Sequence, residues 1–385
     1  MNLNTNIIKN LFFLGSTSIG DLSAAVGKSI PITTKGIKDL LKKGFIQNLG
    51  LTDSTGGRKA FLYKADTENI GNIIAISIER KRTLIDVFNV DKEKLIDTIK
   101  IVIPLKNEIE LLETIISEIE KLKELFSKSS ILGIGIICPG FVDAEKKINN
   151  SLRPDSPLYN VASTIEEQVG ISTYIENDST AIALVEKYFG KAKNSSHTLV
   201  INLTWGVGLG ILIDNKIFRG YKGFAGEFSH IPLADSNKLC LCGKKGCLEV
   251  EASLQTAIDY IEERLHAGEA SILSDYKSEI TYEHLVHAYN VGDQLTIEAM
   301  KKIGHMLGKG IATLMHILNP EKIIIAGKGT IFGDIILSEV QSSIHLYCIP
   351  KLSEQTKIEL SELENVLTLA AASTVIQQIP KINLY

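Results

Sequence analysis

One stretch decides how this sequence is read: Gly226-Glu227-Phe228-Ser229-His230, followed by Cys240-Leu241-Cys242-Gly243-Lys244-Lys245-Gly246-Cys247-Leu248-Glu249. Three of the chain's five cysteines fall within eight residues here, and a histidine precedes the first of them by ten residues. Structural Zn²⁺ takes four tetrahedral ligands, and one histidine with three cysteines is such a set. We therefore predict a structural zinc site on His230, Cys240, Cys242 and Cys247. The alternative is a group of buried small residues, or a disulfide in an otherwise reduced chain.

Two carboxylates, Glu227 and Glu249, flank these ligands although the metal does not need them. A metal that fixes the loop would also fix both side chains beside His230. Two held carboxylates and a histidine suit a ligand rich in hydroxyl groups. The alternative is that both are solvated loop residues.

The stretch resembles the zinc motif and the Gly-Glu-X-Gly-His element of the ROK family, which contains sugar kinases and sugar-responsive repressors such as those for N-acetylglucosamine and xylose. Ser229 stands where the family usually has glycine. Further matches extend from about residue 5 to the C-terminus. The resemblance implies an α/β body of two lobes with the actin-like, ribonuclease H-like fold of the sugar kinases.

Length and composition set limits that agree with this interpretation. A chain of 385 residues predicts two or three domains. It has no run of 18 apolar residues and no signal-peptide pattern at its start, so we expect no membrane segment. Clustered free cysteines favour a reducing compartment, and we expect the chain in the cytoplasm.

The charge is divided unevenly along the chain. Residues 1–64 carry eight lysines and one arginine against three aspartates, a net charge of +6. Because the whole chain has a net charge of −4, residues 65–385 carry −10. A basic head on an acidic body is typical of a nucleic-acid-binding domain attached to a different function.

The first 64 residues have the pattern of a winged helix-turn-helix. Apolar positions from Ile7 to Leu14 predict one helix, and Ser18 is the N-cap of a second that Gly27 ends. Ser29 and Pro31 open a third, and two strands would then enclose a basic hairpin tip at residues 53–59. An unspecialised three-helix head is the alternative. The residues expected to contact DNA are Ser29, Thr33, Thr34, Lys35, Lys38 and Arg58.

We assign three domains. Residues 1–68 form the winged helix-turn-helix, residues 69–178 the first α/β lobe, and residues 179–366 the second α/β lobe with the zinc site. A final helix, at about residues 367–385, is expected to pack back on the first lobe. Alternating strand and helix patterns predict mixed α/β layers in the body.

Two loops that bind ATP in the kinases of this family are altered here. Ser77-Ile78-Glu79-Arg80-Lys81 stands where the kinases have a pattern resembling Asp-X-Gly-Gly-Thr. Side chains at the glycine positions would keep backbone amides away from phosphate, and Glu79 would repel it. In the second loop, Trp205 and Leu209 occupy positions that are small in the kinases. These changes predict that the chain is not an enzyme.

The resemblance implies that three more residues join Glu227, His230 and Glu249 in a sugar site. They are Gly140, Asn177 and Asp178. From the residues themselves, Asn177 and Asp178 could instead cap the helix that follows them.

The favoured function is a transcriptional repressor that binds operator DNA and senses a monosaccharide or a derivative of one. The alternative is an active sugar kinase with an added DNA-binding head. The expected partners are operator DNA, the sugar effector and further copies of the chain, as a homodimer or a dimer of dimers. The expected cofactor is structural zinc. The sequence shows no surface dedicated to a transport protein, which would be a third class of function.

Overall fold

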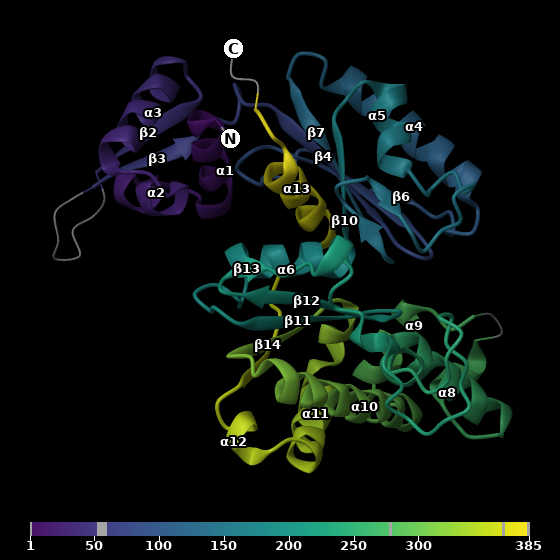
Figure 1. Cartoon of the computed structure of the whole chain (residues 1–385). Coiled ribbons are helices and arrows are strands. Elements are labelled where there is room, and N and C mark those ends of the chain that lie inside the picture. Colours follow the sequence, from purple (N-terminus) through teal and green to yellow (C-terminus); the bar gives the residue numbers. More distant parts are fainter. Residues whose placement is uncertain (1, 52–59, 277–278, 364–365, 383–385) are drawn as a thin grey trace. The chain divides into compact units, whose positions relative to one another are not determined.

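The computed structural model describes residues 2–51, 60–276, 279–363 and 366–382. Contacts divide the chain into two units, Met1–Ala181 with Asn365–Tyr385, and Ile182–Glu364 (Figure 1). Each unit has a five-stranded sheet within its described residues. Nowhere in the described part of the chain is a helix both long and apolar enough to cross a membrane.

The head of the first unit consists of helices and a small sheet. Its helices are α1 (Leu3–Leu14), α2 (Ile19–Val26) and α3 (Ile30–Lys42). Its strands are β1 (Thr17–Ser18), β2 (Ile46–Leu51) and β3 (Phe61–Ala65), in the order β1-β3-β2. The Ser18 side chain accepts a hydrogen bond from Asp21 N, so it is the N-cap of α2 as predicted. The predicted hairpin tip, with Arg58, lies outside the described residues.

The first lobe has a sheet in the order β10-β7-β4-β5-β6. Its strands are β4 (Asn72–Ile78), β5 (Thr83–Phe88), β6 (Ile99–Ile101), β7 (Ile131–Cys138) and β10 (Thr173–Asn177). The small hairpin of β8 (Val142–Asp143) and β9 (Ile148–Asn149) follows β7. Strands β4, β7 and β10 are mutually parallel, whereas β5 is antiparallel to β4.

Helices cover both faces of this sheet (Figure 1). They are α4 (Glu108–Leu125), α5 (Val161–Val169) and α13 (Val366–Gln378). The side chains of Ile134 and Ile136 face the core formed with α4 and α5. Because side chains alternate along a strand, Gly133 and Gly135 face the other way, where α13 approaches them. The C-terminal helix therefore packs on β4 and β7 of the first lobe.

The head packs directly on the first lobe, and a lysine on each side binds a carbonyl oxygen of the other. Lys9 Nζ, on α1, donates to the Gln377 carbonyl oxygen near the end of α13, at 2.9 Å. In return Lys92 Nζ donates to the Phe12 carbonyl oxygen near the end of α1, at 2.8 Å. Each lysine donates to a carbonyl near the C-terminal end of a helix, where cationic side chains are favourable. Head and lobe also share one apolar core, which includes Ile7, Ile8, Leu11, Ile70, Val90, Ile379 and Ile382.

The second unit has a sheet in the order β13-β12-β11-β14-β15. Its strands are β11 (Thr198–Leu203), β12 (Val207–Ile213), β13 (Lys216–Ile217), β14 (Lys322–Ala326) and β15 (Lys357–Leu360). The division between the units falls within α6 (Asp178–Phe189). The other α-helices are α7 (Glu249–Ala252), α8 (Leu254–His266), α9 (Tyr282–Asn290), α10 (Gln294–Leu318), α11 (Gly333–Tyr347) and α12 (Pro350–Ser353). The short 3₁₀ turns are η1 (Tyr221–Gly223), η2 (Phe228–His230), η3 (Ile272–Asp275) and η4 (Lys328–Phe332).

The glycine-rich run at residues 204–210 forms the turn between β11 and β12 and the first part of β12. Strands β11 and β12 pair antiparallel from Thr198 opposite Leu212 to Leu203 opposite Val207. The run is therefore a tight hairpin turn followed directly by a strand.

Candidate functional site

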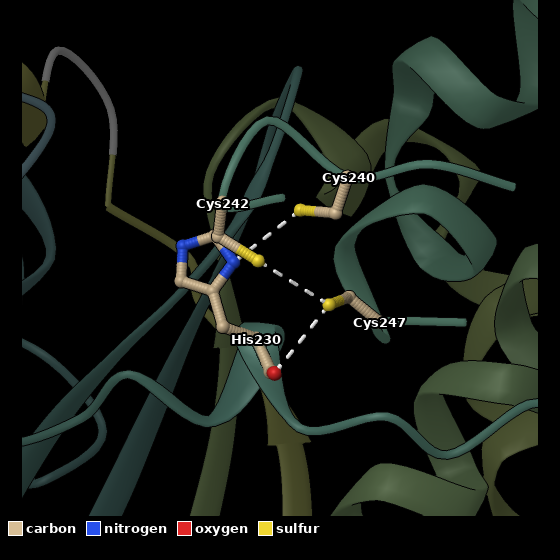
Figure 2. A group of neighbouring side chains, drawn as sticks. All are labelled: His230, Cys240, Cys242 and Cys247. Atoms are coloured by element: carbon tan, nitrogen blue, oxygen red, sulfur yellow. Dashed lines mark hydrogen bonds between the residues drawn. The ribbon is translucent and has the colours of Figure 1, made fainter. Parts of the chain in front are cut away.

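The four predicted metal ligands come together in the second unit. His230 ends η2, and the three cysteines lie in the loop between η2 and α7. The ligand atoms of His230, Cys240, Cys242 and Cys247 all lie within 4.8 Å of one another (Figure 2). The side chains converge on one point from both ends of the loop, as the sequence spacing predicted.

The distances between the donor atoms fit a tetrahedral ion. The His230 Nδ1 atom lies 3.5 Å from Cys240 Sγ, and Cys242 Sγ lies 3.6 Å from Cys247 Sγ. A tetrahedron with Zn–S bonds of about 2.3 Å and Zn–N bonds of about 2.0–2.1 Å has edges of about 3.5 Å between N and S and about 3.8 Å between two S atoms. The arrangement can therefore hold one metal ion without rearrangement of the backbone.

Short backbone hydrogen bonds shape the loop around these ligands. Cys240 N donates to the Lys244 carbonyl oxygen at 2.8 Å, and Gly243 N donates to the Cys240 carbonyl oxygen at 2.9 Å. Leu239 and Leu241 are 69% and 90% exposed. The loop thus buries little apolar surface of its own, so a bound ion would be its main source of order.

The two ring nitrogens of His230 have different surroundings. Its Nδ1 atom faces the cysteine sulfurs, whereas its Nε2 atom lies 3.7 Å from Glu227 Oε2. A metal-bound histidine commonly presents its second nitrogen to a carboxylate, which fixes both groups. The metal would therefore hold His230 and Glu227 in one orientation. One histidine can serve as a metal ligand and still present an N–H to a second ligand.

Glu249 lies at the first position of α7. Its Oε2 atom accepts a hydrogen bond from Val207 N at 3.4 Å, immediately after the glycine-rich turn. This contact connects the metal loop to the start of β12. Glu227, His230 and Glu249 are thus positioned by elements of the second unit, and each has a defined neighbour.

Gly140, Asn177 and Asp178 come together in the first unit. Asn177 Nδ2 donates to the Gly140 carbonyl oxygen at 3.0 Å, and Asn177 Oδ1 accepts from Thr180 N at 3.0 Å. The second bond is an N-cap of α6, so the capping role considered for this pair is present. The first bond holds the loop at Gly140 against the end of β10.

The carboxylate of Asp178 lies in a protected environment. Burial raises its pKa above the usual range, and hydrogen bonds from Ser179 to Oδ1 offset part of that rise. Burial also raises the pKa of the nearby Cys138 thiol to about 12, so this cysteine is a neutral core residue.

The two altered loops are filled by contacts of the chain with itself. The turn after β4 is closed by a backbone hydrogen bond from Glu79 N to the Arg82 carbonyl oxygen at 2.8 Å. The side chains of the same two residues form an ion pair at 3.2 Å. In the second unit, Trp205 is only 9% exposed, and Lys328 Nζ lies 5.5 Å from its ring centroid. Tyr282 packs edge-to-face on the same ring.

The predicted DNA-contacting residues of α3 do not all lie on its surface. Ser29, Lys35 and Lys38 are exposed, and Thr34 is half-buried. Thr33 is fully buried, and its hydroxyl donates to the Ser29 carbonyl oxygen. Thr33 therefore belongs to the core of the head and is removed from the set that could contact DNA.

The prediction from sequence did not include Ile30 and Ile32 among the outward-facing residues of α3. Their side chains are 57% and 48% exposed at the start of this helix. The helical spacing of the buried residues Thr33, Ile37 and Leu40 could have indicated this, because positions 30 and 32 lie outside that stripe.

Comparison with known proteins gives one consistent result. The model of the ROK family matches residues 74–378. The xylose repressor of Caldicellulosiruptor bescii is 31% identical over 333 residues, which cover 85% of this chain and 83% of the relative. The DNA-binding transcriptional dual regulator NagC of Escherichia coli K12 is 26% identical over 345 residues, covering 89% and 84%.

Solved structures extend the similarity over nearly the whole chain. A ROK family transcriptional regulator, described as a homolog of the E. coli MLC protein, has a TM-score of 0.79 at 27% identity and covers 97% of this chain and 95% of its own. A ROK glucokinase of Streptomyces griseus, solved with glucose and AMPPNP, has a TM-score of 0.69 at 25% identity. It covers 78% of this chain and 98% of the kinase. The actin-like sugar-kinase fold predicted for the body is confirmed.

Proposed function

The chain belongs to the ROK family, and from this premise we propose that it is a transcriptional repressor whose operator binding responds to a sugar. The single observation that carries the proposal is the winged-helix head, packed in one unit with the lobe that holds Asn177 and Asp178. Relatives named xylose repressor and N-acetylglucosamine repressor support it.

The head would bind duplex DNA through α3. Residues 1–64 carry a net charge of +6, and Lys35 and Lys38 are exposed on the outer face of this helix. Lysines that neutralise phosphates release counterions and thereby supply affinity that depends on salt. A recognition helix in the major groove with a dimeric arrangement of heads would suit a palindromic operator. We therefore propose a homodimer as the DNA-binding species, with a dimer of dimers as its larger form.

The body would bind a monosaccharide or a derivative of one. Asn177 and Asp178 in the first unit, and Glu227, His230 and Glu249 in the second, are the residues proposed to hold its hydroxyl groups. The protected carboxylate of Asp178 and the Nε2 atom of His230 supply an acceptor and a donor that are already oriented. Zinc is the proposed ion in the metal centre, because its donor set and spacing suit zinc, and it would have a structural role. The cytoplasm is the proposed location, since thiol ligands require a reducing compartment.

A second candidate, an active sugar kinase, is favoured by the glucokinase among the similar structures. Against it, the turn at Glu79 is closed on itself, and Trp205 is covered by Lys328 and Tyr282. Phosphoryl transfer requires backbone amides and a metal ion positioned around the phosphates. We therefore propose that the chain is not an enzyme.

Operator affinity measured with and without sugar tests the proposed function. A duplex is first selected from a random pool with the full chain, and a sugar is identified as the monosaccharide or sugar phosphate that raises the melting temperature most. We expect saturating sugar to lower the affinity of the chain for the duplex about 5–150-fold. This range corresponds to a coupling free energy of about 1–3 kcal/mol. Glu249→Ala should abolish the effect, whereas Glu263→Ala, an exposed residue on α8, should leave it intact. Equal affinities with and without the sugar in the unaltered chain would contradict the proposal.

A further inference from the structure

The first turn of α3 presents apolar side chains to solvent. Ile30 and Ile32 are 57% and 48% exposed, and Pro31 between them is exposed as well. These three consecutive residues stand at the amino-terminal end of the helix that would enter the major groove. In such helices the amino-terminal residues are the ones that reach base edges.

The rotation of α3 that exposes these residues is fixed by its packing on α1. Gly36 lies on the buried side of α3, where an added Cβ would stand 2.6 Å from Ile7 Cδ1 and 3.1 Å from Leu3 Cδ2. Thr33, Ile37 and Leu40 are buried on the same side. The helix cannot turn to bury Ile32 without bringing side-chain bulk into this contact. The exposure of the two isoleucines is therefore built into the head.

At this end of α3 the exposed Ser29 hydroxyl makes no capping hydrogen bond, whereas two threonine hydroxyls that follow it are engaged within the helix. The Thr34 hydroxyl donates to the Ile30 carbonyl oxygen at 2.7 Å, and the buried Thr33 hydroxyl donates within the helix as well. Exposed lysines surround the apolar turn, with Lys28 before it and Lys35 and Lys38 after it. A surface on which exposed isoleucines flank a row of exposed lysines complements a polyanion that offers apolar groups between its phosphates.

Duplex DNA offers one such group in the major groove, the C5-methyl of thymine. We propose that Ile32 and Ile30 each cover a thymine methyl group in the operator half-site, so that the head recognises thymine by apolar contact while the lysines bind phosphates. The inference rests on the proposed function and adds to it the bases that the head prefers. The helical period places Ile30 and Ile32 on either side of the row formed by Pro31, Lys35 and Lys38, so the two methyl groups belong to different base pairs.

Replacing thymine by uracil tests this directly, because it removes the methyl group and keeps the hydrogen-bonding edge. The probe is a duplex selected from a random pool with the full chain, in which each thymine of one half-site is exchanged for uracil in turn. Burial of one methyl contributes about 0.8 kcal/mol, so each contacted position should lose about fourfold in affinity. In the Ile32→Ala chain, one of these positions should show no difference between thymine and uracil, and Ile30→Ala should do the same at another.

Lys38→Ala is the matched control on the same helix. It should weaken the thymine and uracil duplexes by the same factor and reduce the salt slope by about one. Ile32 is half exposed, so its truncation should leave the melting temperature of the chain within a few degrees.

Equal binding of thymine and uracil duplexes by the unaltered chain would overturn the inference and leave the proposed function standing. Failure to select any duplex would overturn both. A change of Ile32 that alters the sedimentation of the chain without DNA, and leaves the thymine preference unchanged, would mean that a second copy covers this face and the inference is wrong.

Discussion

Replacing Cys247 by serine is expected to release the metal from its centre. Cys247 is fully buried, and its Sγ atom lies 3.6 Å from Cys242 Sγ and 3.4 Å from the His230 carbonyl oxygen. A serine hydroxyl stays protonated and is a shorter, harder ligand than a thiolate, so it cannot complete the tetrahedron. Because Leu239 and Leu241 are 69% and 90% exposed, apolar packing does not hold the loop in its place.

The size of the effect follows from the number of ligands. A structural zinc site supplies about 10–16 kcal/mol of apparent binding free energy, so an even share for one of four ligands is about 3 kcal/mol, or roughly two orders of magnitude in Kd. Competition against a zinc indicator dye of known affinity measures this change. Elemental analysis of the purified chain should give about one zinc per chain before the substitution.

Cys348→Ser is the matched control. Cys348 is also buried, at 6% exposure, and lies in the same unit at the end of α11, away from the metal loop. It should retain one zinc with unchanged affinity. If Cys247→Ser competed with the dye for zinc as strongly as Cys348→Ser does, the assignment of the four ligands would be refuted.

Metal loss should also affect the sugar site. Without the ion, Nδ1 of His230 would no longer be bound together with the sulfurs, and the 3.7 Å approach of Nε2 to Glu227 would no longer be fixed. We therefore expect the chelator-treated chain to lose the rise in melting temperature that sugar produces. A ligand at 100 times its Kd stabilises by about 2.7 kcal/mol, which thermal shift detects readily. Full sugar stabilisation after removal of the metal would show that the two sites are independent.

Three further predictions test other parts of the molecule. Turnover of the stabilising sugar with ATP should stay below about 1 s⁻¹, the low end of the range for enzymes, since Trp205 is packed into the altered loop; a coupled assay decides this. Gly140→Ala should destabilise the chain by about 1–3 kcal/mol more than Gly170→Ala. Both glycines have positive φ, but only at Gly140 would the added Cβ clash, with Ser151 Oγ. Thermal unfolding of the two variants measures the difference. Burial lowers the pKa of Lys9 from 10.5 to about 8, so between these pH values the unfolded chain binds more protons than the folded chain. The free energy of unfolding should therefore rise by up to about 3 kcal/mol from about pH 8 to 10.5. Urea unfolding should show this rise in the unaltered chain and not in Lys9→Met.

Local signals in the sequence were sufficient to predict the head. Ser18 and Gly27 bound α2, and Ser29 with Pro31 opens α3, as expected. The orientation of α3 was not predicted, because it depends on contact with α1. At Gly36, Ile7 and Leu3 of α1 leave no room for a side chain. That contact buries Thr33, which the polar pattern had placed outside.

The cluster of His230, Cys240, Cys242 and Cys247 was predictable because its members lie close together in sequence. Their spacing indicated which four residues converge, and the structure brings them together. Which nitrogen of His230 faces the sulfurs depends on the fold of η2, and no spacing could have indicated it. The same holds for Glu249, whose bond to Val207 N joins residues that are far apart in the chain. For Asn177, the two interpretations were not exclusive, since it caps α6 and also binds the Gly140 loop.

We assigned a domain boundary at residue 68, and in the structure the head and the first lobe are in close contact on either side of it. Contacts place the head and the first lobe in one unit, because the lysines Lys9 and Lys92 bind terminal carbonyls across their junction and an apolar core continues through it. A head released by sugar would have to expose this core to water and exchange both lysine–carbonyl bonds for bonds to water, and a hydrogen bond of a charged group contributes about 1.5–3 kcal/mol to stability. A ligand can shift an equilibrium only by its difference in affinity for the two states, and typical coupling is of the same size as a single such cost. We therefore expect sugar to act on the placement of the head together with its lobe, with the contacts of Lys9 and Lys92 intact in both the operator-bound and the sugar-bound chain.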